Sequence, residues 1–265
     1  MMSAVFDLDK QKIKTSFGNA SLSYDSAARL QQQVGLHLLN QYAEKGLSGK
    51  VLDVGCGTGF LTERLLQFAS LETIIALDIA EPMLHRARLR LADHSRVAYV
   101  CADAESLPFM EQQFDSIVSN LALQWCNLNS ETFSRFKKLV KPGGQLIFST
   151  FGPQTLSELK LAWEAVDDYR HVNDFAVQDD LFQALTQAGS KKIQIETVIY
   201  KSAYESVLEL MAELKFLGAH NVARDRKRRL TTKAELRKLL AAYPKTSEEP
   251  GIFATFEVIY VVVSF

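Results

Sequence analysis

Short β-rich runs alternate with helical patterns between residues 50 and 151, and this alternation constrains the fold more than any other feature of the sequence. The β-rich runs occupy residues 51–56, 73–79, 97–103, 114–120 and 145–151. Residues 60–69 and 81–92 carry apolar side chains at helical spacing, and "KPGG" at 141–144 is typical of a turn that ends a helix before the next strand. Strands separated by helices form βαβ units, so this part of the chain predicts a parallel sheet.

The pattern changes after residue 151. Helical patterns cover 154–169 and 178–188, a β-rich run follows at 193–200, a long helical stretch covers about 203–241, and a β-rich run closes the chain at 253–265. No Pro/Gly/Ser-rich linker and no internal repeat divides the 265 residues. We therefore expect a single domain, residues 1–265, with a helical insertion between its two final strands.

Composition limits the class of protein. With 47% hydrophobic residues and a formal net charge of -1, the chain can bury a core without disulfides or metal, and it lacks the basic excess of a nucleic-acid-coating protein. Cys56, Cys101 and Cys126 lie within or beside apolar runs and form no Cys-x-x-Cys pair, so we expect buried, reduced thiols. The N-terminus lacks a leader pattern and the C-terminal apolar run is too short to span a bilayer, which predicts a cytoplasmic location.

The first β-rich run leads directly into a glycine loop, "GCGTG", formed by Gly55, Gly57 and Gly59 with one residue between each pair. Such glycines let the backbone turn sharply and approach a ligand at the carboxyl ends of parallel strands, which predicts a nucleotide-like cofactor site. The dinucleotide pattern G-x-G-x-x-G does not fit, because Phe60 stands where the third glycine belongs. A P-loop does not fit either, because no lysine follows Gly59.

Aspartates stand in or at the ends of three successive β-rich runs. Asp78 lies in the second run, 19 residues after Gly59, where a carboxylate can accept hydrogen bonds from both hydroxyls of a ribose. Asp53 lies within the first run, and Asp103 ends the third. Each alone fits a turn or a helix N-cap, but three beside a glycine loop favour a shared binding site.

The segment "DVGCGTG" looks like the first motif of the class I S-adenosylmethionine-dependent methyltransferases, and the resemblance covers roughly residues 45–151. It implies S-adenosyl-L-methionine as cofactor and an α/β, Rossmann-like fold, with a seven-stranded, mostly parallel sheet whose last strand is antiparallel. It also implies that Asp103 lies next to the adenine amino group and Asp53 near the ammonium end of the cofactor. The expected cofactor-binding residues are Phe17, Asp53, Gly55, Cys56, Gly57, Gly59, Asp78, Ile79, Met83, Asp103, Ala104, Asn120 and Leu121.

Other segments resemble the malonyl-acyl-carrier-protein O-methyltransferases of biotin synthesis, over nearly the whole chain. These segments are "SFGNASLSYDSAARLQ", "SNLALQWC", "FSTFGPQTLSELKLAWEAVD", "LKFLGAHN" and "LTTKAEL". The resemblance implies methyl transfer to the free carboxylate of a malonyl thioester on acyl carrier protein, or on coenzyme A, giving the methyl ester that primes pimeloyl synthesis for biotin. It also implies an N-terminal helical lid (1–45), a cofactor-binding core (46–151) and an acceptor side (152–265).

Such a reaction requires no general base. A malonyl carboxylate is already ionised near neutrality, so it can attack a sulfonium methyl group directly. The five histidines show no metal-ligand spacing, so we expect no metal and assign none of them to catalysis. They are His37, His85, His94, His171 and His220.

Tyr24 is the residue that we expect to act on the reacting groups, through a hydrogen bond to the acceptor carboxylate or through its ring near the sulfonium. Packing of the first helix is the alternative role for Tyr24. Gln31 and Trp125 would line the acceptor site, and Phe17 and Gln31 would help to close the lid. Lys215 is a candidate counter-ion for the acceptor, although most lysines on helices are solvated.

The basic run "RDRKRR" at 224–229 would dock an acidic carrier protein through Arg226 and Arg228; a solvated helix face is the alternative. We expect no nucleic-acid or membrane partner. One rival function is another carboxyl, O- or C-methyltransferase on the same core. Another is a binding protein that keeps the fold without catalysis, against which the intact glycines and strand-end acids argue.

Overall fold

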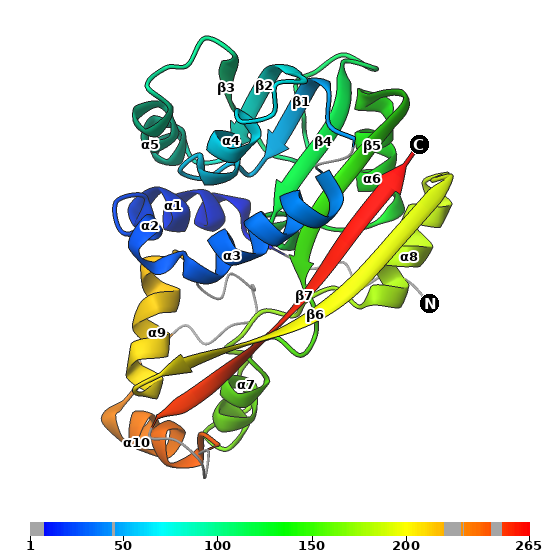
Figure 1. The fold of residues 1–265 in the computed structure, drawn as a ribbon. Coiled ribbons are helices and arrows are strands. Elements are labelled where there is room, and N and C mark those ends of the chain that lie inside the picture. The colour runs from blue at the N-terminus through cyan, green and yellow to red at the C-terminus, as the bar shows by residue number, and fades with distance from the viewer. Residues whose placement is uncertain (1–7, 44–45, 220–228, 230, 245–250) are drawn as a thin grey trace.

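The computed structural model describes residues 8–43, 46–219, 229, 231–244 and 251–265. Its sheet has seven strands in the order β3-β2-β1-β4-β5-β7-β6. The strands are β1 (Gly49–Val54), β2 (Leu71–Asp78), β3 (Val97–Cys101), β4 (Phe114–Asn120), β5 (Val140–Phe151), β6 (Lys192–Tyr204) and β7 (Ile252–Ser264). Neighbouring strands from β3 to β5 are parallel, whereas β7 runs antiparallel to both β5 and β6 (Figure 1). The predicted mostly parallel sheet with an antiparallel last strand is confirmed.

Helices cover both faces of this sheet. They are α1 (Lys10–Ala20), α2 (Tyr24–Ala27), α3 (Arg29–Leu38), α4 (Phe60–Leu65), α5 (Glu81–Leu91), α6 (Ser130–Leu139), α7 (Ser157–Glu164), α8 (Gln178–Gln187), α9 (Val207–Phe216) and α10 (Lys233–Ala242), with a π-helical turn at Leu39–Ala43 and a 3-10 turn, η2, at Leu123–Trp125. Successive strand residues face opposite sides, so Val51 packs in one buried cluster with α3 and α4, and Leu52 in another with α6 and α8.

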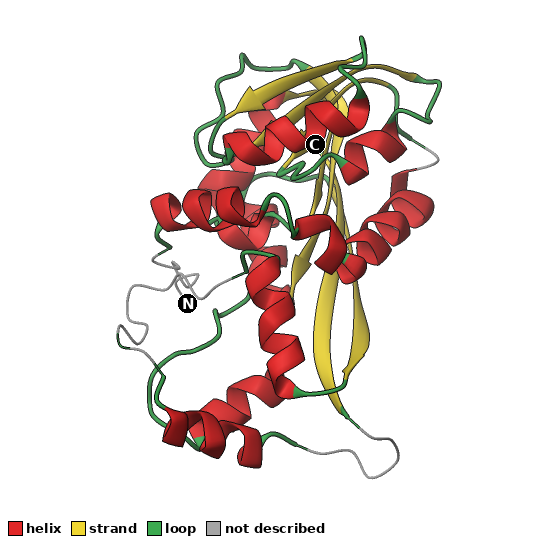
Figure 2. Cartoon of the chain, turned by 90° about the vertical axis from the view of Figure 1, so that its left-hand side faces the viewer, coloured by secondary structure: helices red, strands yellow, loops and turns green. Residues whose placement is uncertain are grey.

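The N-terminal helices α1 to α3 lie across the carboxyl ends of the central strands (Figure 1). The antiparallel pair β6 and β7 extends past the other strands toward α7 and α10, and α9 connects that end of the molecule with the N-terminal helices (Figures 1 and 2). Ser23 Oγ, just before α2, donates to the carbonyl oxygen of Phe216 in α9 at 3.0 Å. The N-terminal segment and the insertion between the last strands therefore meet beside the strand ends, at the place where a cofactor site was predicted.

The "KPGG" segment does not end a helix ahead of a separate strand, as its sequence predicted. The α6 helix ends at Leu139, and β5 starts at once with Val140. Its pairing with β4 jumps from Phe114↔Val140 to Ser116↔Gln145, so residues 141–144 form a bulge inside the strand. The glycines still provide the bend, but a β-bulge makes it instead of a helix-ending turn.

The insertion also differs in its boundaries from the predicted helical stretch at 203–241. The β6 strand continues to Tyr204 because it pairs residue by residue with β7 over its whole length, and the described helices of the insertion are α9 and α10. Cys56 and Cys126 are buried, but Cys101 at the end of β3 is exposed, which corrects the prediction of three buried thiols. No helix in the described ranges is long and apolar enough to cross a membrane.

Candidate active site

The three glycines of the loop after β1 differ in what surrounds them. All have positive φ, at +72° for Gly55, +55° for Gly57 and +86° for Gly59. A Cβ on Gly55 would lie 2.2 Å from the Cβ of Ala122, and a Cβ on Gly59 would lie 3.1 Å from the Cβ of Ala87 in α5. A Cβ on Gly57 would meet no atom closer than 4.0 Å. Gly55 and Gly59 therefore permit close packing, whereas Gly57 presents open backbone to a ligand.

A cavity of about 660 Å³, part of it open to solvent, lies between this loop, the strand ends and the N-terminal helices. We call it the strand-end cavity. Ten of the predicted cofactor residues line it: Phe17, Gly55, Gly57, Asp78, Ile79, Met83, Asp103, Ala104, Asn120 and Leu121. Asp53 and Cys56 instead line an adjoining loop cavity, which shares Tyr24, Gly55, Gly57 and Asn120 with the first. Gly59 lines neither of these cavities.

Asp78 connects the end of β2 to the glycine loop. Its Oδ1 accepts a hydrogen bond from the Ala80 amide at 2.8 Å, and its Oδ2 accepts one from the Gly57 amide at 3.0 Å. Burial raises the pKa of Asp78 to about 6, although these amide hydrogen bonds oppose the increase. Each carboxylate oxygen can accept a further hydrogen bond, so Asp78 can still receive ligand hydroxyl groups.

Asp53 is buried in β1 with an exposed fraction of 1%. Its Oδ2 accepts a hydrogen bond from the Thr62 hydroxyl in α4 at 2.6 Å. Burial raises the pKa of Asp53 to about 7; the Thr62 hydrogen bond opposes this increase and the nearby Asp78 carboxylate adds to it. A cation bound in the loop cavity would compensate the buried charge of Asp53.

A strained residue follows β4. Leu121 has φ +46°, a left-handed conformation that is costly for a side chain of its type. Its amide donates to Ser149 Oγ at 3.0 Å, and the same hydroxyl donates to Asn120 Oδ1 at 2.9 Å. Asn120 Nδ2 donates in turn to the carbonyl of Gln31 in α3 at 2.8 Å. This network connects the end of β4 with α3 at the cavity.

Two polar contacts hold α2, one with the glycine loop and one with α5, and the sequence did not indicate them. Thr58 Oγ1, inside the loop, donates to Asp25 Oδ1 at 2.5 Å, and Arg90 of α5 pairs with Asp25 Oδ2 at 2.8 Å. The neighbouring Tyr24 thereby lines both the strand-end and loop cavities. Burial raises the pKa of Tyr24 well above its ordinary value, so the phenol is neutral and can donate a hydrogen bond.

Lys10 is a further residue at this site that the sequence did not indicate. It begins α1, lines the strand-end cavity and forms an ion pair with Asp103 at 3.3 Å. Asp9 caps the helix by accepting from the Lys12 amide at 3.0 Å. Asp9 in the sequence can indicate the start of a helix. The sequence does not indicate that Lys10 pairs with Asp103, 93 residues away.

A side cavity lies between α3, α7 and α9, and Trp125 lines both this cavity and the strand-end cavity. Its wall is mainly apolar, with polar groups at Gln31, Thr155, His171, Asn173 and Glu213. The predicted acceptor residues Gln31 and Trp125 therefore come together here. Lys215 does not join them: it is exposed on α9 and lines none of the three cavities. Arg226 and Arg228 lie outside the described residues.

The raised pKa of Asp53 predicts how the stability of the ligand-free protein changes with pH. A carboxyl group with a pKa near 7 when folded and 3.8 ordinarily binds more protons in the folded state, so the unfolding free energy falls as pH rises from about 4 to 7. Asp53→Asn should reduce the fall between about pH 5 and 7.5 by about 1 to 2 kcal/mol, measured by urea denaturation. Asp115→Asn is the control, because the pKa of Asp115 is lowered and its titration lies below this range. Equal pH slopes for Asp53→Asn and the unmodified protein would contradict the assignment.

Comparison with known proteins agrees with this geometry. A family model described as a methyltransferase domain matches residues 52–148. A malonyl-acyl-carrier-protein O-methyltransferase of Methylococcus capsulatus is 39% identical over 260 residues, covering 96% of this chain and 94% of that protein. A biotin biosynthesis bifunctional protein of Cellvibrio japonicus is 39% identical over 257 residues, and this chain spans 97% of its own length but 50% of that protein.

A solved phosphoethanolamine N-methyltransferase of Haemonchus contortus, in complex with S-adenosyl-L-methionine, superposes with a TM-score of 0.58 at 14% identity, over 93% of this chain and 57% of that one. At that identity the likeness concerns the fold alone. The methyltransferase-domain match supports S-adenosylmethionine as the cofactor. Identity over nearly the full length of the Methylococcus protein shows that this chain belongs to the family of malonyl-acyl-carrier-protein O-methyltransferases.

Proposed function

We propose that this chain transfers a methyl group from S-adenosylmethionine to the free carboxylate of a malonyl thioester carried on acyl carrier protein, with coenzyme A as the alternative carrier. The product would be the methyl ester that the resemblance connects with biotin synthesis. The name of the Methylococcus relative supports the malonyl acceptor, and the name of the Cellvibrio relative supports a role in biotin synthesis. The observation that carries the proposal is that Trp125 lines two cavities, one suited to the cofactor and one with a mainly apolar wall.

The residues around the strand-end cavity fit the cofactor. Asp78 and Asp103 offer carboxylate oxygens to ribose hydroxyls and to an adenine amino group, and Gly57 leaves room along the backbone. In the adjoining loop cavity, Asp53 matches a cationic ammonium group. The same three acids disfavour a pyrophosphate, which separates this site from dinucleotide sites. When bound, S-adenosylmethionine supplies a methyl group on a positively charged sulfur.

The chain contributes positioning rather than proton transfer. No histidine among the described residues lines the strand-end or loop cavity, and Tyr24 is a neutral phenol. A carboxylate acceptor is already ionised, so the protein needs to align the reactants and exclude water, a contribution that can reach about 7 to 11 kcal/mol.

Uncharged hydrogen-bond donors would bind the acceptor carboxylate. The described wall of the side cavity contains no lysine or arginine. Gln31 Oε1 is buried without a hydrogen-bond partner among the described residues, and a flipped amide would place its NH₂ donors there instead. With the Tyr24 hydroxyl, this amide would orient the carboxylate toward the methyl group. An acidic carrier protein would dock through Arg226 and Arg228, and the proposal includes no nucleic-acid or membrane partner.

The proposed reaction can be tested by mass spectrometry of malonyl-acyl carrier protein incubated with the enzyme and S-adenosylmethionine. We expect one added methyl group on the acyl chain and an equal amount of S-adenosylhomocysteine. Acetyl-acyl carrier protein is the matched control, because it has the thioester and the carrier but no free carboxylate, and it should gain no methyl group. An enzyme that binds the cofactor but methylates free malonate or a quinol precursor in preference to the malonyl carrier would support a rival methyltransferase instead.

Tyr24→Phe separates the hydroxyl of Tyr24 from its ring. Loss of a hydrogen bond to a charged acceptor group should lower kcat/KM for the malonyl carrier about tenfold or more, while S-adenosylhomocysteine affinity stays within about twofold. Tyr24→Ala, which also removes the ring, should lower both quantities. If Tyr24→Phe retains the kinetics of the unmodified enzyme and Tyr24→Ala does not, the residue acts through packing and the proposed hydroxyl contact is wrong.

A further inference from the structure

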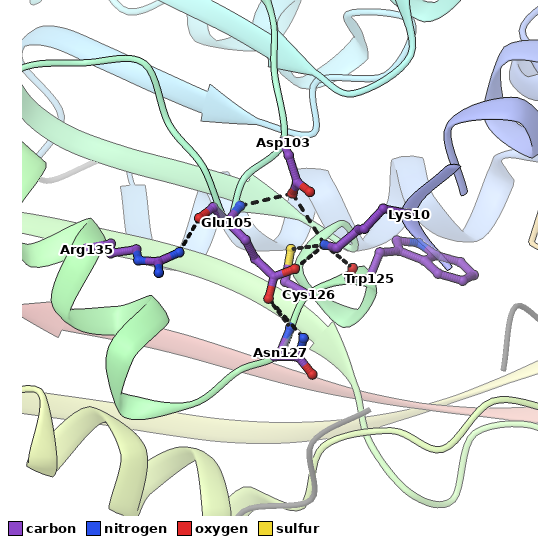
Figure 3. Close-up of polar contacts among 7 residues, drawn as sticks. All are labelled: Lys10, Asp103, Glu105, Trp125, Cys126, Asn127 and Arg135. Carbon is purple, nitrogen blue, oxygen red and sulfur yellow. Dashed lines mark hydrogen bonds and ion pairs between the residues drawn. The ribbon is translucent and has the colours of Figure 1, made fainter. Parts of the chain in front are cut away.

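Lys10 lines the strand-end cavity. Its ammonium group lies among Asp103, Glu105 and Trp125, and we call this arrangement the Lys10 socket (Figure 3). Its ammonium group donates to the carbonyl oxygen of Trp125 at 2.9 Å and pairs with Asp103 Oδ1 at 3.3 Å. It also forms a close ion pair with the Glu105 carboxylate. The socket therefore joins the start of α1 to the loop after β3 and to η2, three segments that are far apart in the sequence.

These contacts use the hydrogen-bonding capacity of Lys10. An ammonium group has three N–H donors, and three oxygen atoms surround it here. Asp103, Glu105 and Cys126 are close enough together to resemble a metal site, but the ammonium lies among them. Lys10 therefore acts on a ligand through its neighbours and not through a free donor.

Both carboxylate oxygens of Glu105 have partners in the socket. Its Oε1 accepts from the backbone amide of Asn127 at 3.0 Å and from the Asn127 side-chain amide at 3.1 Å, while its other oxygen faces Lys10 (Figure 3). The Lys10 ammonium and these amides keep the pKa of Glu105 below its ordinary value, although burial opposes them. Glu105 thus remains ionised and holds the ammonium beside Asp103.

The two oxygens of Asp103 have different surroundings. Oδ1 accepts from Lys10 at 3.3 Å and from the Glu105 amide at 3.0 Å. Oδ2 accepts no hydrogen bond from any residue that the structure describes, and Asp103 lines the strand-end cavity. One oxygen is therefore held by the socket, and the other is available to a ligand.

We infer that Lys10 is a positioning residue for the cofactor: its ammonium group holds Asp103 so that Oδ2 accepts the amino group of adenine. This inference rests on the proposed cofactor. Lys10 belongs to α1, so it holds Asp103 only when the N-terminal lid is docked. Docking of the lid and recognition of the nucleobase are therefore coupled. A lid that opens removes the counter-charge of Asp103 and releases its carboxylate from this orientation.

The test measures binding by calorimetry, without turnover, for S-adenosylhomocysteine and for S-inosylhomocysteine, in which an oxygen replaces the adenine amino group. Lys10→Met should weaken S-adenosylhomocysteine binding about tenfold or more and bring the affinity ratio of the two ligands close to one. Lys10→Arg keeps the charge and should restore part of the ratio. Lys14→Met is the matched control, because Lys14 is an exposed lysine one turn later on α1 and lines none of the three cavities.

Two outcomes would overturn the inference. One is an unchanged affinity ratio in Lys10→Met, even with weaker binding, because a general loss of lid packing affects both ligands equally. The other is a Lys10→Met effect of the same size in an Asp103→Asn background, because Lys10 would then not act through the carboxylate. Failure of the unmodified protein to bind S-adenosylhomocysteine would instead contradict the proposed function.

Discussion

Parallel strands end at one edge of the sheet, and three aspartates in or after these strands bring negative charge to that edge. Each acid is partly satisfied by a different group: Asp53 by the Thr62 hydroxyl, Asp78 by two backbone amides, and Asp103 by Lys10 and an amide. Each retains capacity to accept a further donor or to face a cation. A ligand with hydroxyl groups, an amino group and positive charge but no phosphate fits this arrangement, which is why the site suits S-adenosylmethionine.

The N-terminal segment completes this edge through three separate contacts. Lys10 binds the acids after β3, Asp25 binds the glycine loop through Thr58, and the Gln31 carbonyl accepts from Asn120 at the end of β4. The side chain of Gln31 also forms part of the side cavity. The N-terminal helices therefore line both the strand-end cavity and the side cavity. Under the proposed function, cofactor binding should prepare the enzyme for its acceptor.

The sequence predicted the structural features that depend on residues close together in the chain. Alternating apolar runs indicated the strands, and the residue types at 55, 57 and 59 indicated the loop, because both depend on nearest neighbours along the chain. The pairing of Lys10 with Asp103 could not be predicted, since it joins residues 93 positions apart through tertiary packing. The β5 bulge and the exposure of Cys101 also depend on neighbouring strands and not on local pattern. The acceptor was predicted from family resemblance alone; Lys215, expected beside it, lies on the exposed face of α9.

We propose that the cofactor and a malonyl thioester meet beside Trp125, beneath the N-terminal helices that Lys10 and Asp25 hold at the strand ends. A crystal structure of the complex with S-adenosylhomocysteine and a malonyl thioester would test this placement. We expect adenine beside Asp103, ribose beside Asp78, and the acyl arm in the side cavity with its carboxylate near Tyr24 and Gln31. An acyl arm that reaches the sulfur by another route, with the side cavity empty, would contradict the proposed function.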